Sequence, residues 1–348
     1  MATIVENNAF RKLGLDHPLI VAPMAGGPSS PELVAAASAA GALGSAGAAY
    51  SSPEEIEKFA AQVRQRTDRP FAINLFIPHS IPQIDPGAVE RAFAATAKYR
   101  AELDLAPAPF SGPYAEDFDA QFEAVLRARP AVFSFVFGLL TAEHRRAARR
   151  AGILLIGTAT MPEEAQLLEE SGVDAITLQG FEAGGHRGIF DPDAADSEIS
   201  IRDLLALTVP RVRVPLIAAG GIMTADDIRA ALAAGAQAVQ MGTAFLANAE
   251  AGTSPPYRSK LLEPARKTRT TRVFSGRLAR GIENRFMDEM DAEAIMPFPA
   301  QNKFTRDIRT ASAASGSADF LSLWAGTGQG NLWQGPASEL IEQLFSKA

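Results

Sequence analysis

One segment of the chain, residues 179–188, combines a loop-forming composition with the side chain best suited to proton transfer. Its sequence, QGFEAGGHRG, has four glycines in ten residues. That is too many for a helix or strand interior, so we expect a loop that wraps around a ligand. The loop contains His186, and imidazole exchanges protons readily near neutral pH. We therefore predict that His186 is catalytic.

The other three histidines carry no comparable signal. His17 precedes the first predicted strand, His79 lies in a proline-rich stretch, and His144 stands beside RRAARR on a predicted helix. Within the glycine-rich loop, Glu182 and Arg187 are either site residues or partners in a salt bridge, and the sequence does not choose between these roles.

Two further glycine-containing segments predict a phosphate site. Residues 219–224 (AGGIMT) and 240–243 (QMGT) each follow or end a predicted strand. Glycine lets backbone N–H groups approach an anion closely, and a threonine hydroxyl adds a donor. Ordinary turn chemistry would explain either segment alone, but two after consecutive strands favour a phosphorylated ligand. The predicted residues are Gly220, Gly221, Gln240, Met241, Gly242 and Thr243.

Two other strand ends suit a flat ring. Met24 belongs to APMAGG, whose small residues allow close backbone access, and Asn74 ends the strand-like run FAINL. The Asn74 amide can both accept from and donate to a ring that carries a carbonyl and an N–H. The alternative is that Asn74 satisfies the backbone of a turn.

These residues follow strands that alternate with helices. A glycine at the end of an apolar helix is followed at once by a short β-rich run at Gly41, Gly152, Gly172 and Gly235, as is typical of a helix C-terminus. The runs are apolar on both faces, which favours parallel strands covered by helices. The predicted strands are residues 19–24, 42–46, 71–75, 131–137, 153–157, 175–179, 215–219 and 238–241.

Eight such strands predict an α/β fold, a (β/α)8 (TIM) barrel, with active-site residues at the carboxyl ends of the strands. A doubly wound open sheet is the alternative, but it usually has fewer strands. We assign residues 1–254 to the barrel, with an insertion at 76–114 after the third strand. Residues 255–348 are assigned to a C-terminal helical elaboration packed over the barrel mouth.

Helix starts carry matching signals. Ser30 and Ser52 each precede a proline, an arrangement typical of an N-cap followed by the first helical turn. Capping-box spacing occurs at Ser52, at Thr160 with Glu163, and at Thr224 with Asp227.

The composition excludes several classes of function. The 348 residues include 33 Lys and Arg against 40 Asp and Glu, a formal net charge of −7, which offers no basic surface for nucleic acid or an anionic membrane. No cysteine is present, which excludes thiolate metal sites, Fe–S clusters and cysteine nucleophiles, and we predict no metal site. We find no signal peptide and no membrane-spanning run, so we expect a cytoplasmic protein that binds a small molecule. A homo-oligomer is compatible with the sequence.

Five motifs occur in order along the chain: APMAGGPSSPELVAAASAAGALGSAGA, PFAINLFIP, VFSFVFG, ITLQGFEAGGHRG and AAGGI…QMGTAF. Together they resemble the motifs of class I nitronate monooxygenases, once called 2-nitropropane dioxygenases. The resemblance covers roughly residues 18–260, and EAGGHRG in this company is its most specific part.

The resemblance implies a barrel that binds FMN non-covalently and uses O2 to oxidise alkyl nitronates to a carbonyl compound and nitrite. Propionate 3-nitronate is the expected substrate, with some nitroalkanes also accepted. It makes His186 the catalytic base, which accepts the α-proton of a neutral nitroalkane or positions a nitronate anion. It places FMN against Met24, Asn74, Gln179, Gly184, Gly221 and residues 240–243.

The resemblance also extends to polar residues that approach the active site. Tyr114, Tyr257 and Lys303 match such residues, whereas Phe298 stands in a Phe-Pro step where a further tyrosine is expected. This phenylalanine removes a phenol from the expected site.

Two alternatives remain at this stage. A flavin-dependent enoyl-acyl-carrier-protein reductase shares the Gly-Gly-His loop, and an FMN-dependent quinone reductase shares the fold, but both need NAD(P)H, for which we find no recognisable site. A non-catalytic flavin-binding protein is the other alternative, and the histidine in the loop argues against it.

Overall fold

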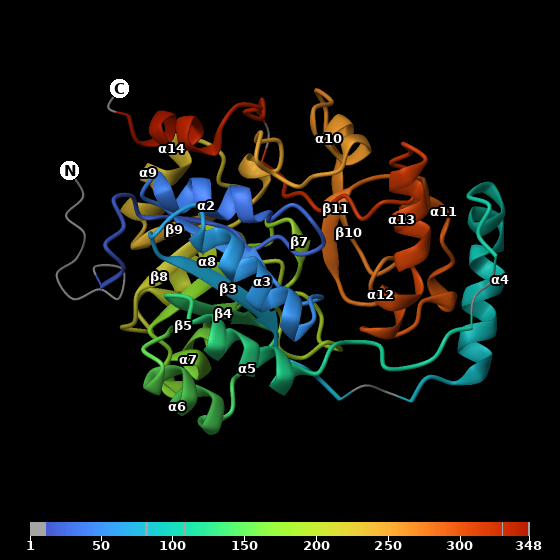
Figure 1. Cartoon of the computed structure of the whole chain (residues 1–348), viewed down its shortest axis with the longest axis horizontal. Coiled ribbons are helices and arrows are strands. Elements are labelled where there is room, and N and C mark those ends of the chain that lie inside the picture. The colour runs from blue at the N-terminus through green and yellow to red at the C-terminus, as the bar shows by residue number, and fades with distance from the viewer. Residues whose placement is uncertain (1–11, 81–82, 107–108, 329, 347–348) are drawn as a thin grey trace.

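Within the described residues, eight parallel strands close into a barrel (Figure 1). The computed structural model describes residues 12–80, 83–106, 109–328 and 330–346. The barrel order is β1-β2-β3-β4-β5-β6-β8-β9, so the predicted (β/α)8 barrel is confirmed and the open sheet is excluded. The barrel strands are β1 (Leu19–Val21), β2 (Leu43–Gly47), β3 (Phe71–Phe76), β4 (Val132–Val136), β5 (Leu154–Ala159), β6 (Ala175–Gln179), β8 (Leu216–Ala219) and β9 (Ala238–Met241).

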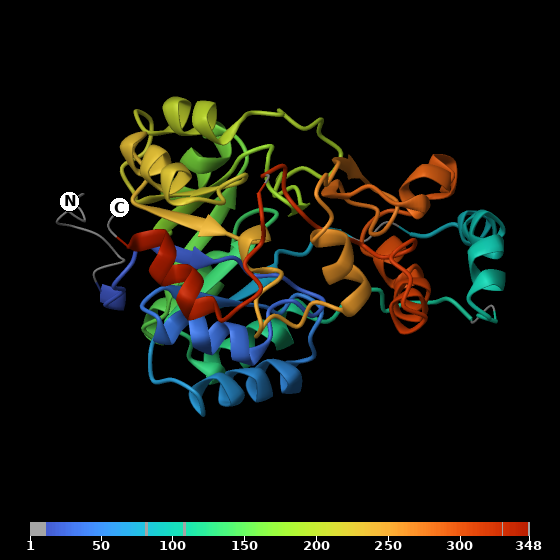
Figure 2. The same ribbon diagram turned by 90° about the horizontal axis from the view of Figure 1, so that it is seen from above.

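A ring of helices covers the outside of the barrel, as is usual for this fold. Its last position, between α9 and α2, is filled by α14 from the end of the chain (Figures 1 and 2). The C-terminal segment therefore supplies one helix of the ring itself. The ring helices are α2 (Pro31–Ala39), α3 (Pro53–Arg64), α5 (Phe118–Ala128), α6 (Ala142–Arg150), α7 (Pro162–Ser171), α8 (Ile201–Thr208), α9 (Ala225–Ala233) and α14 (Ala337–Phe345).

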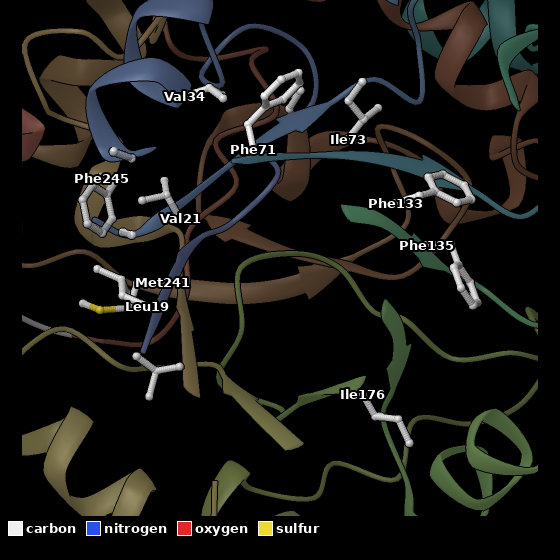
Figure 3. Packing of buried hydrophobic residues seen from close by; sticks show 14 of the residues in the cluster. Leu19, Val21, Val34, Phe71, Ile73, Phe133, Phe135, Ile176, Met241 and Phe245 are labelled. Carbon is white, nitrogen blue, oxygen red and sulfur yellow. The ribbon is translucent and has the colours of Figure 1, made fainter. Parts of the chain in front are cut away.

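The barrel core has two layers because successive strand residues point to opposite faces. Each of the eight strands contributes one buried residue to an inner cluster, which combines three alanines with five larger side chains such as Ile20, Leu43 and Ile217. The residues between them face the helices, and Figure 3 shows Leu19, Phe133 and other members of this outer cluster. The strands are thus apolar on both faces, as the sequence predicts.

Most of the predicted helix starts are confirmed. The side chain of Ser30 caps α2, and Ser52 and Thr224 form capping boxes with Glu55 and Asp227. The prediction for Thr160 is wrong. Helix α7 starts one residue later, after Met161, because β5 continues to Ala159 and a proline occupies the first helical position.

The C-terminal segment contains strands as well as helices, which the sequence analysis did not anticipate. Strand β11 (Ala279–Ile282) pairs antiparallel with β10 (Thr268–Thr271) on one side and with β7 (Gly185–His186) on the other. The helices are α10 (Pro255–Leu261), α11 (Arg285–Glu289), α12 (Ala300–Phe304) and α13 (Arg306–Ala314), with short 3-10 turns η1 (Thr243–Phe245) and η2 (Ala292–Ala294).

The insertion after β3 forms α4 (Pro86–Glu102), which lies at the far end of the molecule from the termini, beside α11, α12 and α13 (Figures 1 and 2). Arg100 is buried and forms an ion pair of 2.5 Å with Asp307. Its guanidinium also packs against the rings of Phe93 and Phe304. An exposed ion pair from Arg285 to Glu102 adds a second link.

Replacing Arg100 by methionine should therefore loosen α4. The substitution keeps the apolar packing but removes charge-assisted hydrogen bonds, so we expect the free energy of unfolding in urea to fall by about 1–3 kcal/mol. Arg285→Met is the matched control, and it should cost less because an exposed pair contributes little. Equal losses in the two variants would contradict the proposed importance of the buried pair.

Candidate active site

A cavity of about 600 Å³ lies at the carboxyl ends of the barrel strands, the usual place of the active site in this fold. His186 and every residue predicted to contact flavin are part of its wall. The latter are Met24, Asn74, Gln179, Gly184, Gly220, Gly221, Gln240, Met241, Gly242 and Thr243. The sequence prediction therefore brings together residues from five strand ends.

Strand pairing and an amide hydrogen bond hold His186 in place. His186 pairs with Ala279 of β11, and the side chain of Gln179 donates to the His186 carbonyl over 2.9 Å. The imidazole lies among aromatic rings, with centroid distances of 5.7 Å to Phe76 and 5.5 Å to Trp324. These rings make part of the surroundings of the histidine apolar, while His186 itself lines the cavity.

The hydrogen bonds around Ser275 assign the proton on the imidazole. His186 Nε2 lies 2.9 Å from Ser275 Oγ. That hydroxyl donates its proton to the carbonyl of Arg277 and accepts from the Arg277 N–H. Because its one proton is committed, Ser275 Oγ accepts from His186, so Nε2 is protonated and Nδ1 is not. No described residue forms a hydrogen bond with Nδ1, which leaves this nitrogen free as a base.

The surroundings of His186 keep it neutral. Burial lowers the pKa of His186 to about 3, and the positive charges of Arg277 and Arg309 act in the same direction. The Arg277 guanidinium stacks on the ring of Phe137 at 3.7 Å, and burial lowers the Arg277 pKa to about 10. A neutral imidazole with a free Nδ1 is the form that accepts a proton.

The glycines after β8 and β9 form a cradle of backbone donors. Gly220 and Gly221 have φ angles of +121° and +70°, a region that favours glycine. The N–H groups of Gly221, Gly242 and Thr243 donate no hydrogen bond to any described residue. Thr243 Oγ1 accepts from the Gly326 N–H at 3.0 Å, which leaves its own proton free to donate.

Residues 326–328 complete this cradle, and they were not predicted from the sequence. Gly326 and Gly328 line the cavity, and the Thr327 N–H donates to the Glu182 carbonyl over 2.9 Å. A Cβ on Gly184 would lie 2.5 Å from backbone atoms of this segment, so Gly184 is needed for close packing of two backbones. The sequence GTGQG was the available signal.

Amide side chains fix the strand ends around the cavity. Asn74 Nδ2 donates to Ser134 Oγ on the neighbouring strand over 3.0 Å, so its oxygen and second N–H stay available for a ligand. Gln179 Oε1 accepts from the N–H of Gly188 at 2.8 Å. Gln179 therefore also shapes the glycine-rich loop.

The two charged residues left open in that loop have structural partners. Arg187 is buried and pairs with Asp196 at 2.6 Å. The Glu182 carboxylate accepts from the N–H of Ile201 at 3.0 Å. Neither side chain lines the cavity. The structure therefore favours a structural role for Glu182 and Arg187 within the loop over a role as site residues.

The polar residues expected from the C-terminal resemblance separate into two groups. Tyr257 lines the cavity, but its hydroxyl donates to the Trp324 carbonyl, and burial raises its pKa. Tyr114 and Lys303 are absent from the described cavity wall, and Lys303 donates to the carbonyls of Ser111 and Pro113. In this structure, they bind the insertion to α12 rather than approach the site.

Phe298, which stands where a tyrosine is expected, packs against His186. The centroids of its ring and the His186 ring are 6.0 Å apart, and Phe298 also contacts Phe76 and Phe137. The substitution thus extends the apolar surround of the imidazole.

The structure adds polar residues that the sequence analysis did not select. Tyr50, Arg306 and Arg309 line the cavity, and Ser275 contacts the histidine. They lie far from the glycine motifs in sequence, and no local pattern marked them.

Two searches of the described residues gave negative results. No group of three or more His, Asp or Glu side chains is arranged to hold a metal ion. No described helix is long and apolar enough to cross a membrane.

Comparison with known proteins gives a consistent picture. The sequence model of the family described as nitronate monooxygenase matches residues 8–347. The nitronate monooxygenase of Pseudomonas aeruginosa is 41% identical over 346 residues, 97% of each chain. That of Paraburkholderia phytofirmans is also 41% identical, over 95% of this chain and 92% of its own.

Solved structures agree. A nitroalkane oxidase from Streptomyces ansochromogenes has a TM-score of 0.89 at 39% identity and covers 97% of this chain and 96% of its own. FabK from Thermotoga maritima has a TM-score of 0.74 at 26% identity and covers 98% and 95%. The chain belongs to the nitronate monooxygenase family of flavin-dependent oxidoreductases.

Proposed function

We propose that this enzyme uses bound FMN and O2 to oxidise alkyl nitronates to a carbonyl compound and nitrite. The observation that carries the proposal is the neutral His186, with Nδ1 free, in the same cavity as a cradle of unpaired backbone donors. Propionate 3-nitronate and some nitroalkanes are the substrates that we propose.

The residues present fit FMN. The backbone of Gly242 does not have a positive φ. A Cβ at this position would also fit, since it would meet only Ala22 and Met24 at 3.4 Å and 3.8 Å. Glycine at this position therefore leaves room on the cavity wall. The free N–H groups of Gly221, Gly242 and Thr243 suit a phosphate.

The flat ring of FMN would be held near the ends of β1, β3 and β6. Met24, Asn74, Gln179 and Gly184 are the proposed contacts. When bound, FMN would accept electrons from the nitronate and would then react with O2.

The protein's own contribution begins with proton transfer. A neutral nitroalkane is a carbon acid, and His186 accepts its α-proton at Nδ1. A nitronate is already deprotonated, so this proton transfer is needed only for the neutral substrate. Phe76, Phe298 and Trp324 make part of the surroundings of this step apolar.

The first test is aerobic mixing of the purified holoenzyme with an alkyl nitronate and, separately, with NADH. Nitrite release without NADH bleaching supports the proposal. NADH bleaching without nitrite would instead support an NAD(P)H-dependent reductase, the reaction class considered as an alternative from the sequence.

The protonation state of His186 is directly measurable. The lowered pKa means that His186 stays neutral throughout pH 5–8, because protonation is disfavoured until the pH approaches about 3. Imidazole NMR of the flavin-free protein should show the Nε2–H tautomer across this range. Ser275→Ala should lose the tautomer preference while the barrel stays folded. A wild-type His186 that titrates near its ordinary pKa would contradict this assignment.

Gly242→Val should weaken FMN binding. The side chain would block close approach of phosphate to the backbone, and loss of one or two charge-assisted hydrogen bonds corresponds to a roughly 10–100-fold higher Kd. Flavin fluorescence titration of the apoprotein measures this Kd. Thermal unfolding of the same apoprotein is the control and should change little. Unchanged FMN affinity would show that the phosphate lies elsewhere.

His186→Asn separates the two substrate forms. Loss of a general base should lower kcat/KM for a neutral nitroalkane by about 10²–10⁴-fold, whereas turnover of the pre-formed nitronate should fall much less. FMN content is measured in parallel because a disturbed loop could release the flavin. Equal losses for both substrates with FMN retained would show that His186 acts through binding or electrostatics.

A further inference from the structure

The wall of the cavity has an uncompensated positive charge. Its described lining includes Arg306 and Arg309 but no aspartate or glutamate. The two arginines are three residues apart on α13, and residues with this spacing share a helix face. Neither forms an ion pair with a described residue.

Arg309 is held in place by neutral groups only. Its Nη2 donates to the carbonyl and the side-chain oxygen of Asn302 at 2.6 Å and 3.0 Å, and its Nε donates to the Thr305 carbonyl at 3.3 Å. The two N–H groups of Nη1 donate to no described residue. This guanidinium is therefore oriented and has two unused donors.

The nearby carboxylate is already engaged. Asp307, which acts electrostatically on Arg309, is paired with Arg100 of the insertion. Tyr50 also lies close enough for the charges of Arg309 and Arg306 to act on its hydroxyl, yet burial still raises the Tyr50 pKa to about 12. Its hydroxyl therefore stays protonated and is a third donor without a described acceptor.

Resting on the function proposed above, we infer that Arg309, supported by Arg306 and Tyr50, binds a planar two-oxygen anionic group of the substrate. Unused N–H and O–H donors beside a half-buried positive charge fit such a group. Arg309 and His186 line the same cavity, and the charge of Arg309 acts on the imidazole. The inferred role is selection of anionic nitronates over neutral nitroalkanes.

Two substrate groups share this chemistry: the nitronate itself and a carboxylate on its side chain. Kinetics with three substrates distinguish them: a simple alkyl nitronate, a nitronate that also bears a carboxylate, and the neutral nitroalkane. If Arg309 binds the nitronate, KM rises for both nitronates. If it binds the carboxylate, KM rises only for the second.

The variants are Arg309→Met, Arg309→Lys and, as matched control, Arg229→Met. Arg229 lies on α9 in an exposed pair with Asp226, so its loss removes one positive charge outside the cavity. We expect Arg309→Met to raise the relevant nitronate KM about 10–100-fold, the effect of losing a charge-assisted contact. The nitroalkane KM should change less than about threefold, and Arg309→Lys should restore part of the loss.

Binding of propionate and of nitrate to the holoenzyme, followed by the absorbance spectrum of the flavin, supplies a readout independent of turnover. Arg309→Met should weaken this binding, and Arg229→Met should not. If the wild type releases no nitrite from any nitronate, the proposed function fails, and anion binding alone decides whether the anion site exists. Equal KM changes for nitronate and nitroalkane, or unchanged anion binding, would overturn the inference.

Discussion

The catalytic arrangement depends on the pairing of β7 with β11. The glycine-rich loop is held from within by the buried Arg187 and by Gln179, and from outside by this strand pairing. The pairing sets His186 opposite Ala279, and the turn before β11 brings Ser275 to Nε2 of the imidazole. Because β11 belongs to the segment that follows the barrel, residues far along the chain determine which nitrogen of the histidine carries the proton.

Local charge in the cavity is opposite to the charge of the whole molecule. The chain has a net charge of −7, yet two arginines and no carboxylate face the cavity among its described lining residues. An anion near the flavin ring responds to these nearby charges more than to distant, solvent-screened ones. The charge of Arg309 also disfavours the protonated imidazole. Attraction of an anionic substrate and maintenance of a neutral base therefore have a common physical origin.

The sequence predicted the parts of the site that have a local cause. Gly220, Gly221 and Gly242 follow strands. The alternation of strands and helices predicted that the ends of these strands lie on one face of a barrel. Ser275 and Arg309 were not predicted because their roles depend on tertiary contacts. Ser275 contacts His186 from a distant segment of the chain, and Arg309 reaches the cavity wall from α13. Tyr114 and Lys303 show the converse, since a resemblance marked them as site residues, whereas the structure places them beside each other, outside the cavity wall.

The insertion acts on the site through α13. Helix α4 contributes no residue to the described cavity lining. Its Arg100 instead pairs with Asp307 of α13. Asp307 is one residue from Arg306 and two residues from Arg309, and residues at these spacings lie on different faces of a helix. Asp307 acts electrostatically on Arg309, and its pairing with Arg100 offsets part of that negative charge. Through Arg100, the insertion thus lowers the negative charge that Arg309 experiences from its own helix.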